Sequence, residues 1–296
     1  MLDRGRGWRV SHFADRLIRA SCEHGPLCVG IDPHAGRIPD LFGGDTAVGV
    51  LSWAEAVIDC VKGRAGVVKP QVGLFERLGP QGFGALQNTM QVARDAGLLV
   101  LADAKRGDIG STAEGYAKAY LADDAPFPAD AVTVNPYMGI DTLEPFVRTA
   151  EEYGKGVIVL ARTSNPGAAD FQSKDLEGAP LYSRVVQALL PMGERLKGES
   201  GWSGLMLVTG ATGPDEAREL RALSPNALFL VPGYGAQGAG ANEAVAGFVN
   251  GEGGVVNASR SMTFSKAANA ATSISEWREA VTVSYTHLTL PTTPYV

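Results

Sequence analysis

The 296-residue sequence lacks any long apolar stretch, and its longest clean apolar runs have only five residues, as in Leu98–Ala102. A membrane-spanning helix needs about 18 or more such residues, so we expect no membrane span. The N-terminal segment contains several arginines but no continuous apolar core of the kind that secretory signals have. Export is therefore not expected.

Cysteine and histidine are scarce, with three and four residues respectively. The cysteines show no C-x-x-C spacing, and no histidine has a partner four residues away or a cluster of acidic or cysteine neighbours. Neither a disulfide framework nor a zinc site is predicted. A reducing, cytoplasmic location fits this composition, and the chemistry has to come from other residue types.

Positive charge is also in deficit, because 26 Lys and Arg stand against 32 Asp and Glu, a net charge of −6. A chain of this charge is not expected to bind nucleic acid or an anionic membrane in a general way. With 45% apolar and 20% charged residues, it should instead form a globular core. Any anionic ligand must then be held by local groups.

Short apolar segments alternate with longer helical patterns, and eight of these segments are predicted strands. The strands are expected at 27–31, 67–70, 98–104, 131–134, 157–160, 205–208, 228–231 and 255–257. The helices are expected at 47–62, 83–96, 112–121, 143–153, 181–196, 215–223, 242–250 and 264–280. In addition, Ser11 is a candidate N-cap for a leading helix with Phe13 and Leu17 on one face, expected to pack on the bottom of the domain.

Eight strand–helix units are what a closed (β/α)8 TIM barrel of the α/β class requires, whereas a doubly wound open sheet is the rival arrangement. A barrel gathers functional groups at the carboxyl ends of many strands, and an open sheet gathers them at one switch point. Polar residues and one glycine stand at or just past most of the predicted strand ends: Asp32, Lys69, Asp103, Lys105, Asn135, Thr163, Gly233 and Arg260. This distribution favours the barrel.

The chain divides into three predicted regions. Residues 1–25 form an N-terminal extension with the leading helix, and residues 26–282 form the barrel, close to the usual size. Residues 283–296 contain no acidic or basic residue and are rich in Thr, so we expect them not to continue the preceding helix. They are interpreted as a non-native extension or a disordered tail.

The densest group of charges follows the third strand, where Asp103, Lys105 and Asp108 occur within six residues. Strand alternation places Asp103 and Lys105 on the same face. Lys69 ends another apolar strand, so lysines and aspartates can converge at one end of the sheet. The alternative is a solvated loop with an incidental ion pair. Charges at the ends of buried strands carry a desolvation cost, however, which a purely structural role does not require.

Glycines and an arginine follow the last two strands. The sequence Pro-Gly233-Tyr-Gly235-Ala-Gln237-Gly238 comes after the seventh strand, and Ser259-Arg260 comes after the eighth. Barrel enzymes frequently bind phosphate in these two loops, where backbone N–H groups approach an anion and Arg supplies a planar fork. A glycine-rich loop alone could equally be a flexible linker, but its pairing with Ser259-Arg260 favours phosphate.

These motifs together resemble the orotidine 5′-phosphate decarboxylase family, specifically its longer bacterial subfamily. Asp103-Ala-Lys105-Arg-Gly-Asp108 resembles the D-x-K-x-x-D signature of the family, and the resemblance extends over roughly residues 11–280. Further similar segments are Val29-Gly-Ile-Asp32-Pro, Val68-Lys69-Pro-Gln, Val134-Asn135-Pro-Tyr, Thr163-Ser164-Asn165-Pro-Gly and the two phosphate loops.

The resemblance implies decarboxylation of orotidine 5′-monophosphate (OMP) to UMP and carbon dioxide, without cofactor or metal. Lys105 would stabilise and then protonate the carbanion, while Asp103 would disfavour the substrate carboxylate and keep Lys105 charged. Lys69 and Asp108 would complete a network of alternating charge. Substrate contacts are implied for Asp32 and Thr112 (ribose), Ser164 (pyrimidine amide edge), Ile109 (packing near the base), and Gln237 and Arg260 (phosphate), with Gly233, Gly235, Gly238 and Ser259 in the phosphate loops.

A homodimer with shared active sites is a further implication of the resemblance. In the family the second Asp of the signature enters the neighbouring subunit's site, so Asp108 and Thr112 are expected to act across the dimer. Spacing alone leaves this open, because three residues beyond Lys105 can reach about 10 Å and can also fold back.

Three alternatives remain at this point. A sugar-phosphate decarboxylase of the same superfamily would use a similar motif with Mg²⁺, but an acidic residue is expected there in place of Lys69, and a protonated lysine cannot ligate a metal. A Schiff-base aldolase would need a neutral Lys105, which two aspartates oppose. A non-catalytic barrel that binds a nucleotide phosphate is the third possibility.

Overall fold

The computed structural model describes residues 12–234, 240–288 and 290. Eight parallel strands close into a barrel in the order β1-β10-β9-β8-β5-β4-β3-β2. The strands are β1 (Leu27–Ile31), β2 (Val67–Pro70), β3 (Leu99–Arg106), β4 (Ala131–Val134), β5 (Gly156–Arg162), β8 (Ser203–Thr209), β9 (Ala227–Val231) and β10 (Gly254–Ala258). Because β1 pairs with both β2 and β10, the predicted (β/α)8 barrel is confirmed and the open-sheet rival is wrong.

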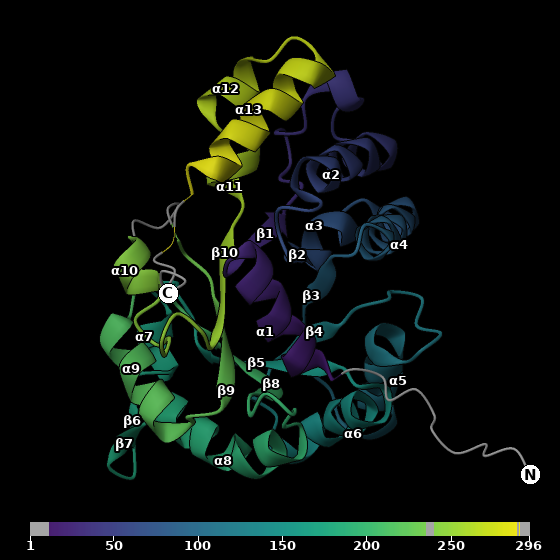
Figure 1. Cartoon of the computed structure of the whole chain (residues 1–296). Coiled ribbons are helices and arrows are strands. Elements are labelled where there is room, and N and C mark those ends of the chain that lie inside the picture. The colour runs from purple at the N-terminus through teal and green to yellow at the C-terminus, as the bar shows by residue number, and fades with distance from the viewer. Residues whose placement is uncertain (1–11, 235–239, 289, 291–296) are drawn as a thin grey trace, which may run out of the picture.

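Helices surround this ring of strands (Figure 1). The main covering helices are α2 (Ala47–Val61), α4 (Gly79–Asp95), α5 (Gly110–Leu121), α6 (Glu144–Tyr153), α8 (Leu181–Arg195) and α9 (Pro214–Leu223). Shorter elements are α3 (Val72–Glu76), α7 (Ala168–Phe171), α10 (Ala241–Ala244), the 3-10 turns η1 (Asp40–Phe42) and η2 (Ile140–Leu143), and a small hairpin of β6 (Asp175–Leu176) and β7 (Ala179–Pro180). None of the helices in the described part of the chain is long and apolar enough to cross a membrane.

Strand alternation divides the core into an inner and an outer part. In β3, Leu99 and Leu101 belong to the cluster that fills the barrel, whereas Val100 and Ala102 belong to the larger cluster between strands and helices. Strands buried on both faces explain the continuous apolar runs in the sequence. The same alternation carries Asp103 to the inner face, at the point where the barrel opens.

Helix α1 (Phe13–His24) closes the other end of the barrel. Figure 1 shows it lying across the middle of the ring of strands, and Phe13, Ala14 and Leu17 are fully buried in the inner cluster. Gly156 in β5 makes room for the Phe13 ring, since a Cβ there would lie 2.3 Å from it. The predicted leading helix at the barrel bottom is therefore present, but its N-cap is His12, and the candidate Ser11 lies outside the described residues.

The C-terminal part differs from the prediction in three ways. The helix expected at 264–280 is divided into α12 (Lys266–Ala270) and α13 (Ile274–Thr286), with the short α11 (Arg260–Thr263) before them. The helix expected at 242–250 is only the short α10. The expectation that the chain stops being helical before Val283 is wrong, because α13 continues through it. The Tyr285 hydroxyl donates to the carbonyl of Arg64 at 2.7 Å, which ties this last turn to the barrel.

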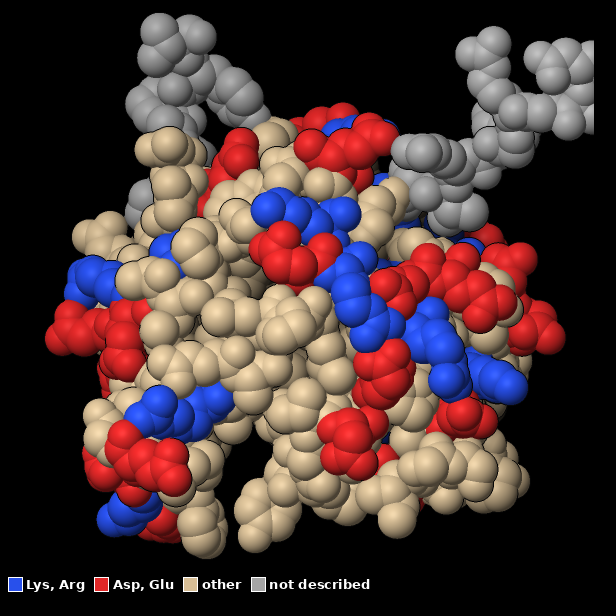
Figure 2. Space-filling model, turned by 90° about the horizontal axis from the view of Figure 1, so that it is seen from below, with Lys and Arg blue, Asp and Glu red and all other residues tan. Residues whose placement is uncertain are grey.

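Charged side chains of both signs are interspersed on the face that points downward in Figure 1, over α6 and α8 (Figure 2). Arg195 of α8 is 2.7 Å from Glu144 and 2.5 Å from Glu151, both in α6. Arg195 thus links these two neighbouring helices, and exposed pairs of this kind contribute little stability each.

The buried position of Phe13 gives a stability prediction. We expect Phe13→Ala to lower the free energy of unfolding by about 3–5 kcal/mol, because truncating a buried aromatic ring leaves a cavity. The matched control is Val48→Ala, since Val48 is 75% exposed and its truncation should change stability by less than about 0.5 kcal/mol. Denaturant unfolding of both variants tests this, and equal effects would contradict the role of α1 as a closing helix.

Candidate active site

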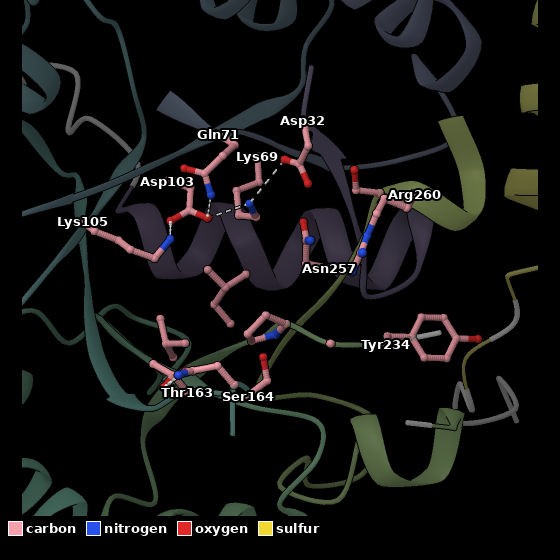
Figure 3. A pocket seen from close by; sticks show the side chains of 16 residues that line it. Asp32, Lys69, Gln71, Asp103, Lys105, Thr163, Ser164, Tyr234, Asn257 and Arg260 are labelled. Carbon is pink, nitrogen blue, oxygen red and sulfur yellow. Dashed lines mark hydrogen bonds and ion pairs between the residues drawn. The ribbon is translucent and has the colours of Figure 1, made fainter. Parts of the chain in front are cut away.

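A pocket of about 310 Å³ opens at the carboxyl ends of the strands, opposite α1. Figure 3 looks into this pocket, with α1 visible behind it at the far end of the barrel. The predicted site residues among its lining are Asp32, Lys69, Asp103, Lys105, Ser164, Gly233, Ser259 and Arg260. Residues from six different strands or the loops after them therefore meet here, as expected for a barrel.

Asp103 lies at the centre of a network of charges. Its two carboxylate oxygens accept from different lysines, Oδ2 from Lys69 Nζ at 2.8 Å and Oδ1 from Lys105 Nζ at 2.6 Å (Figure 3). Lys69 Nζ is also 3.9 Å from Asp32 Oδ1. The four side chains form an alternating sequence of negative and positive charge, in the order Asp32, Lys69, Asp103 and Lys105.

The end of β3 is shaped to bring Lys105 into this network. Pairing with β4 is interrupted between Ala102 and Arg106, which indicates a bulge, and Lys105 has a left-handed φ of +47°. Its backbone N–H donates to Thr133 Oγ1 at 2.8 Å, and the Thr133 hydroxyl in turn donates to Asp103 Oδ1 at 3.1 Å. Thr133 therefore fixes both the backbone of Lys105 and the carboxylate of Asp103.

Burial differs strongly along the network. The side chain of Lys69 is 4% exposed and that of Asp103 is 10% exposed, whereas that of Lys105 is 47% exposed. Lys69 is thus almost fully enclosed, although it still forms part of the pocket lining. Lys105 projects its ammonium group into the open part of the pocket, where a ligand would meet it.

The pKa values of the enclosed groups follow from burial and charge together. Burial on its own would lower the pKa of Lys69, but the charges of Asp103 and Asp32 outweigh it and raise the pKa. Burial would likewise raise the pKa of Asp103, and Lys69 and Lys105 overcome it and lower the pKa well below its usual range. Both groups therefore stay charged at neutral pH. Burial raises the pKa of the nearby Cys28 thiol to about 12, so this thiol stays neutral.

Two polar lining residues, Gln71 and Asn257, were given no role from the sequence. Gln71 donates from Nε2 to Asp103 Oδ2 at 2.8 Å, and Asn257 lies between Lys69 and Arg260 (Figure 3). Alternation provided a signal for both. Gln71 is two residues beyond Lys69, and Asn257 is two residues beyond Val255, a member of the inner cluster.

Other predicted site residues lie elsewhere or outside the described residues. Gly235, Gln237 and Gly238 are outside the described residues. Asp108, Ile109 and Thr112 do not line the pocket, and Ile109 is 62% exposed. Asn135, expected to face the same mouth, instead lines a neighbouring apolar groove, together with Tyr137 and Phe171.

The family model for the orotidine 5′-phosphate decarboxylase / HUMPS family matches residues 25–274. The chain belongs to this family. It is 37% identical to orotidine 5′-phosphate decarboxylase of Rhodopirellula baltica, over 91% of this chain and 95% of that protein. It is 44% identical to the enzyme of the same name from Salinispora tropica, over 78% and 82% of the two chains.

Solved structures of the family agree with the fold. The Leishmania donovani OMP decarboxylase superposes with a TM-score of 0.72 at 32% identity, covering 91% of this chain and 94% of that one. A Streptomyces avermitilis structure, described provisionally as an orotidine 5′-phosphate decarboxylase, superposes with a TM-score of 0.80 at 36% identity. The superposition covers 96% of each chain. The family resemblance inferred from the motifs is thus confirmed.

The coupling between Lys69 and Asp103 predicts a particular pH dependence of stability. Asp103 has a lowered pKa in the folded chain, so its stabilising contribution is complete above the usual value of 3.8 and is lost as the pH falls through the lowered pKa. Lys69 has a raised pKa, so its contribution is complete below 10.5 and is lost as the pH rises through the raised pKa.

We therefore expect Asp103→Asn to lose about 3 kcal/mol of unfolding free energy at pH 7, because it leaves a buried ammonium without its main partner. Below pH 3.8 its stability should fall less steeply with pH than that of the unmodified chain. Denaturant titrations at a series of pH values measure both effects. If the free energy of unfolding falls equally steeply with pH in both proteins below pH 3.8, Asp103 does not titrate as described.

Proposed function

We propose that this chain decarboxylates orotidine 5′-monophosphate to UMP and carbon dioxide, a step of pyrimidine biosynthesis. The observation that carries the proposal is the Lys69–Asp103–Lys105 network at the mouth of a barrel of this family. Relatives of which the chain covers most of the length are named for this activity.

The chemical difficulty is the charge left behind when the carboxylate departs. The electron pair of the broken C–C bond stays in an sp² orbital in the plane of the ring, which does not overlap with the ring's π-system, so a fixed positive charge must stabilise it. Lys105 Nζ, held by Asp103 and exposed to the pocket, is placed to stabilise this pair and then donate a proton to the carbon. The products are carbon dioxide and UMP, and Lys105 regains its proton from water.

Asp103 has a second role in this mechanism. Its carboxylate remains ionised because two lysines lower its pKa, so it would repel the carboxylate of a substrate placed against Lys105. That repulsion ends when carbon dioxide leaves, while the attraction between Lys105 and the developing carbanion grows. The arrangement thus favours the transition state over the bound substrate.

The remaining lining residues give the substrate an orientation. With the reacting carbon at Lys105, a nucleotide can extend toward Arg260 and Ser259 at the other end of the pocket, where its phosphate would bind (Figure 3). Asp32 would contact the ribose between these ends, and Ser164 would contact the amide edge of the pyrimidine. Gln237 and the glycines of the same loop, Gly233, Gly235 and Gly238, are proposed to complete the phosphate site.

The chain is further proposed to act as a homodimer with shared sites. Asp108, Ile109 and Thr112 lie outside the chain's own pocket, so they are available to a neighbouring subunit. Apolar side chains are exposed nearby, with Ile109 62% exposed and Tyr137 85% exposed. A Cβ on Gly107 would lie 3.8 Å from Met138, so the loops after β3 and β4 are in contact and can form one surface.

The cytoplasm is the proposed location of the enzyme. The three cysteines are all described, and no disulfide joins them, as a reducing compartment allows. The metal-dependent alternative is disfavoured by Lys69, since its enclosed ammonium occupies the position where an acidic ligand is expected.

The activity is tested by following the loss of orotidylate ultraviolet absorbance with a chelator-treated sample. We expect full activity in the unmodified protein and a loss of at least about a thousandfold in Lys105→Ala, because the variant lacks the stabilising charge and the proton donor. UMP should still bind to the variant with appreciable affinity, as measured by calorimetry. An unmodified protein that binds UMP without turning over OMP would support the non-catalytic barrel instead.

The shared site is tested by mixing two variants. Lys105→Ala and Asp108→Ala are each expected to be nearly inactive alone, since each damages every site of its own homodimer. Subunit exchange in an equimolar mixture should restore about a quarter of the original activity, because half of the dimers are hybrids and each hybrid has one intact site. A mixture that stays inactive although exchange is demonstrated would show that Asp108 acts within its own subunit.

A further inference from the structure

Asn257 places an amide on the inner face of the barrel, within the pocket. It lies in β10 beside β1, where it is the register partner of Cys28. The neighbouring residue on the inner side, Gly30, has no side chain, and a Cβ there would come within 3.2 Å of Asn257 Oδ1. The glycine thus leaves the space that the amide occupies.

This amide oxygen is buried, and no group in the described part of the chain donates to it. An unsatisfied buried acceptor is unfavourable, and native proteins rarely leave one without a protein, water or ligand partner. Asp32 Oδ1, on the adjacent strand end, is also buried and accepts no hydrogen bond from described residues. Among the described residues, no donor hydrogen-bonds to either of these two acceptors, which face one pocket from neighbouring positions.

The oxygens of Asp103 differ from these two. Oδ1 accepts from Lys105 and Thr133, and Oδ2 accepts from Lys69 and Gln71, so both are already occupied. A ligand that brings hydroxyl donors into the pocket is therefore best received by Asp32 and Asn257.

The position of Asn257 indicates which part of a nucleotide it would meet. Figure 3 shows it between Lys69 and Arg260, that is, between the end proposed for the reacting base and the end proposed for the phosphate. The ribose of a nucleoside monophosphate connects these two groups and has two adjacent hydroxyls. Each hydroxyl can donate one hydrogen bond.

We infer that Asn257 Oδ1 accepts a hydrogen bond from a ribose hydroxyl and so helps to select ribonucleotides over deoxyribonucleotides. The inference rests on the proposed function, because it takes the nucleotide orientation from it. A site built to hydrogen-bond a hydroxyl discriminates strongly against an analogue that lacks it, since the acceptor is then left buried and unpaired. Asn257 is thus a specificity-determining residue that acts on the sugar and not on the reacting carbon.

The test compares binding of UMP, 2′-deoxy-UMP and 3′-deoxy-UMP to the unmodified protein and to Asn257→Ala by calorimetry. We expect Asn257→Ala to weaken UMP binding about tenfold, the value of one ordinary hydrogen bond. Binding of one of the two deoxynucleotides, the one that lacks the contacting hydroxyl, should be unchanged by the substitution. Asn257→Leu, which keeps the volume without the acceptor, should behave in the same way and replaces Asn257→Ala if that variant is poorly folded.

The matched control is Thr209→Val. Thr209 lies at the end of β8, outside the pocket lining, and its side-chain oxygen is also buried without a hydrogen-bond partner in the described residues. It should leave all three affinities unchanged. Equal weakening of all three nucleotides by Asn257→Ala would overturn the inference in favour of a structural role, and unchanged UMP binding would overturn it in favour of a buried water. Because OMP turnover by the unmodified protein is measured separately, these outcomes are distinct from a failure of the proposed function.

Discussion

A lysine ammonium enclosed between two carboxylates is the interaction on which the site depends. Lys69 is nearly inaccessible to solvent, and the charges of Asp103 and Asp32 outweigh the burial that would lower its pKa. Its charge in turn keeps Asp103 ionised, and Asp103 holds Lys105 at the open side of the pocket. Removal of Lys69 or Asp103 would take from the other its closest buried partner of opposite charge, so the network holds together as a unit.

The barrel supplies the conditions for this network. Its inner cluster is apolar below the level of Asp103, so charges at the mouth are poorly screened from that side. Parallel strands end at the same level, which brings residues that are far apart in the sequence, such as Lys69 and Arg260, into one pocket. The bulge at the end of β3 then adjusts a single side chain, that of Lys105, without changing the strand order.

Most of this arrangement could be predicted from the sequence because it depends on local patterns. Apolar runs of strand length specified the eight barrel strands to within about two residues, and alternation placed Asp103 and Lys105 together. Gln71 and Asn257 were missed because a single amide in a strand carries no charge signal, although alternation would have placed both on the inner face. The roles proposed for Asp108 and Thr112 depend on a second subunit, which no local pattern describes.

The prediction of where the last helix ends was wrong, because it was based on amino-acid composition alone. Residues from Val283 onward have no charged side chains, yet α13 continues to Thr286, because helix formation there is supported by packing and by the hydrogen bond from Tyr285.

The position of helix α1 determines the path by which ligands can enter and leave the barrel. Because Phe13 and Leu17 close one end of the barrel, its interior is open at one end only and is not a channel. A ligand that enters at the carboxyl ends of the strands has to leave through the same opening. A product cannot pass along the barrel axis to an enzyme docked at the opposite end.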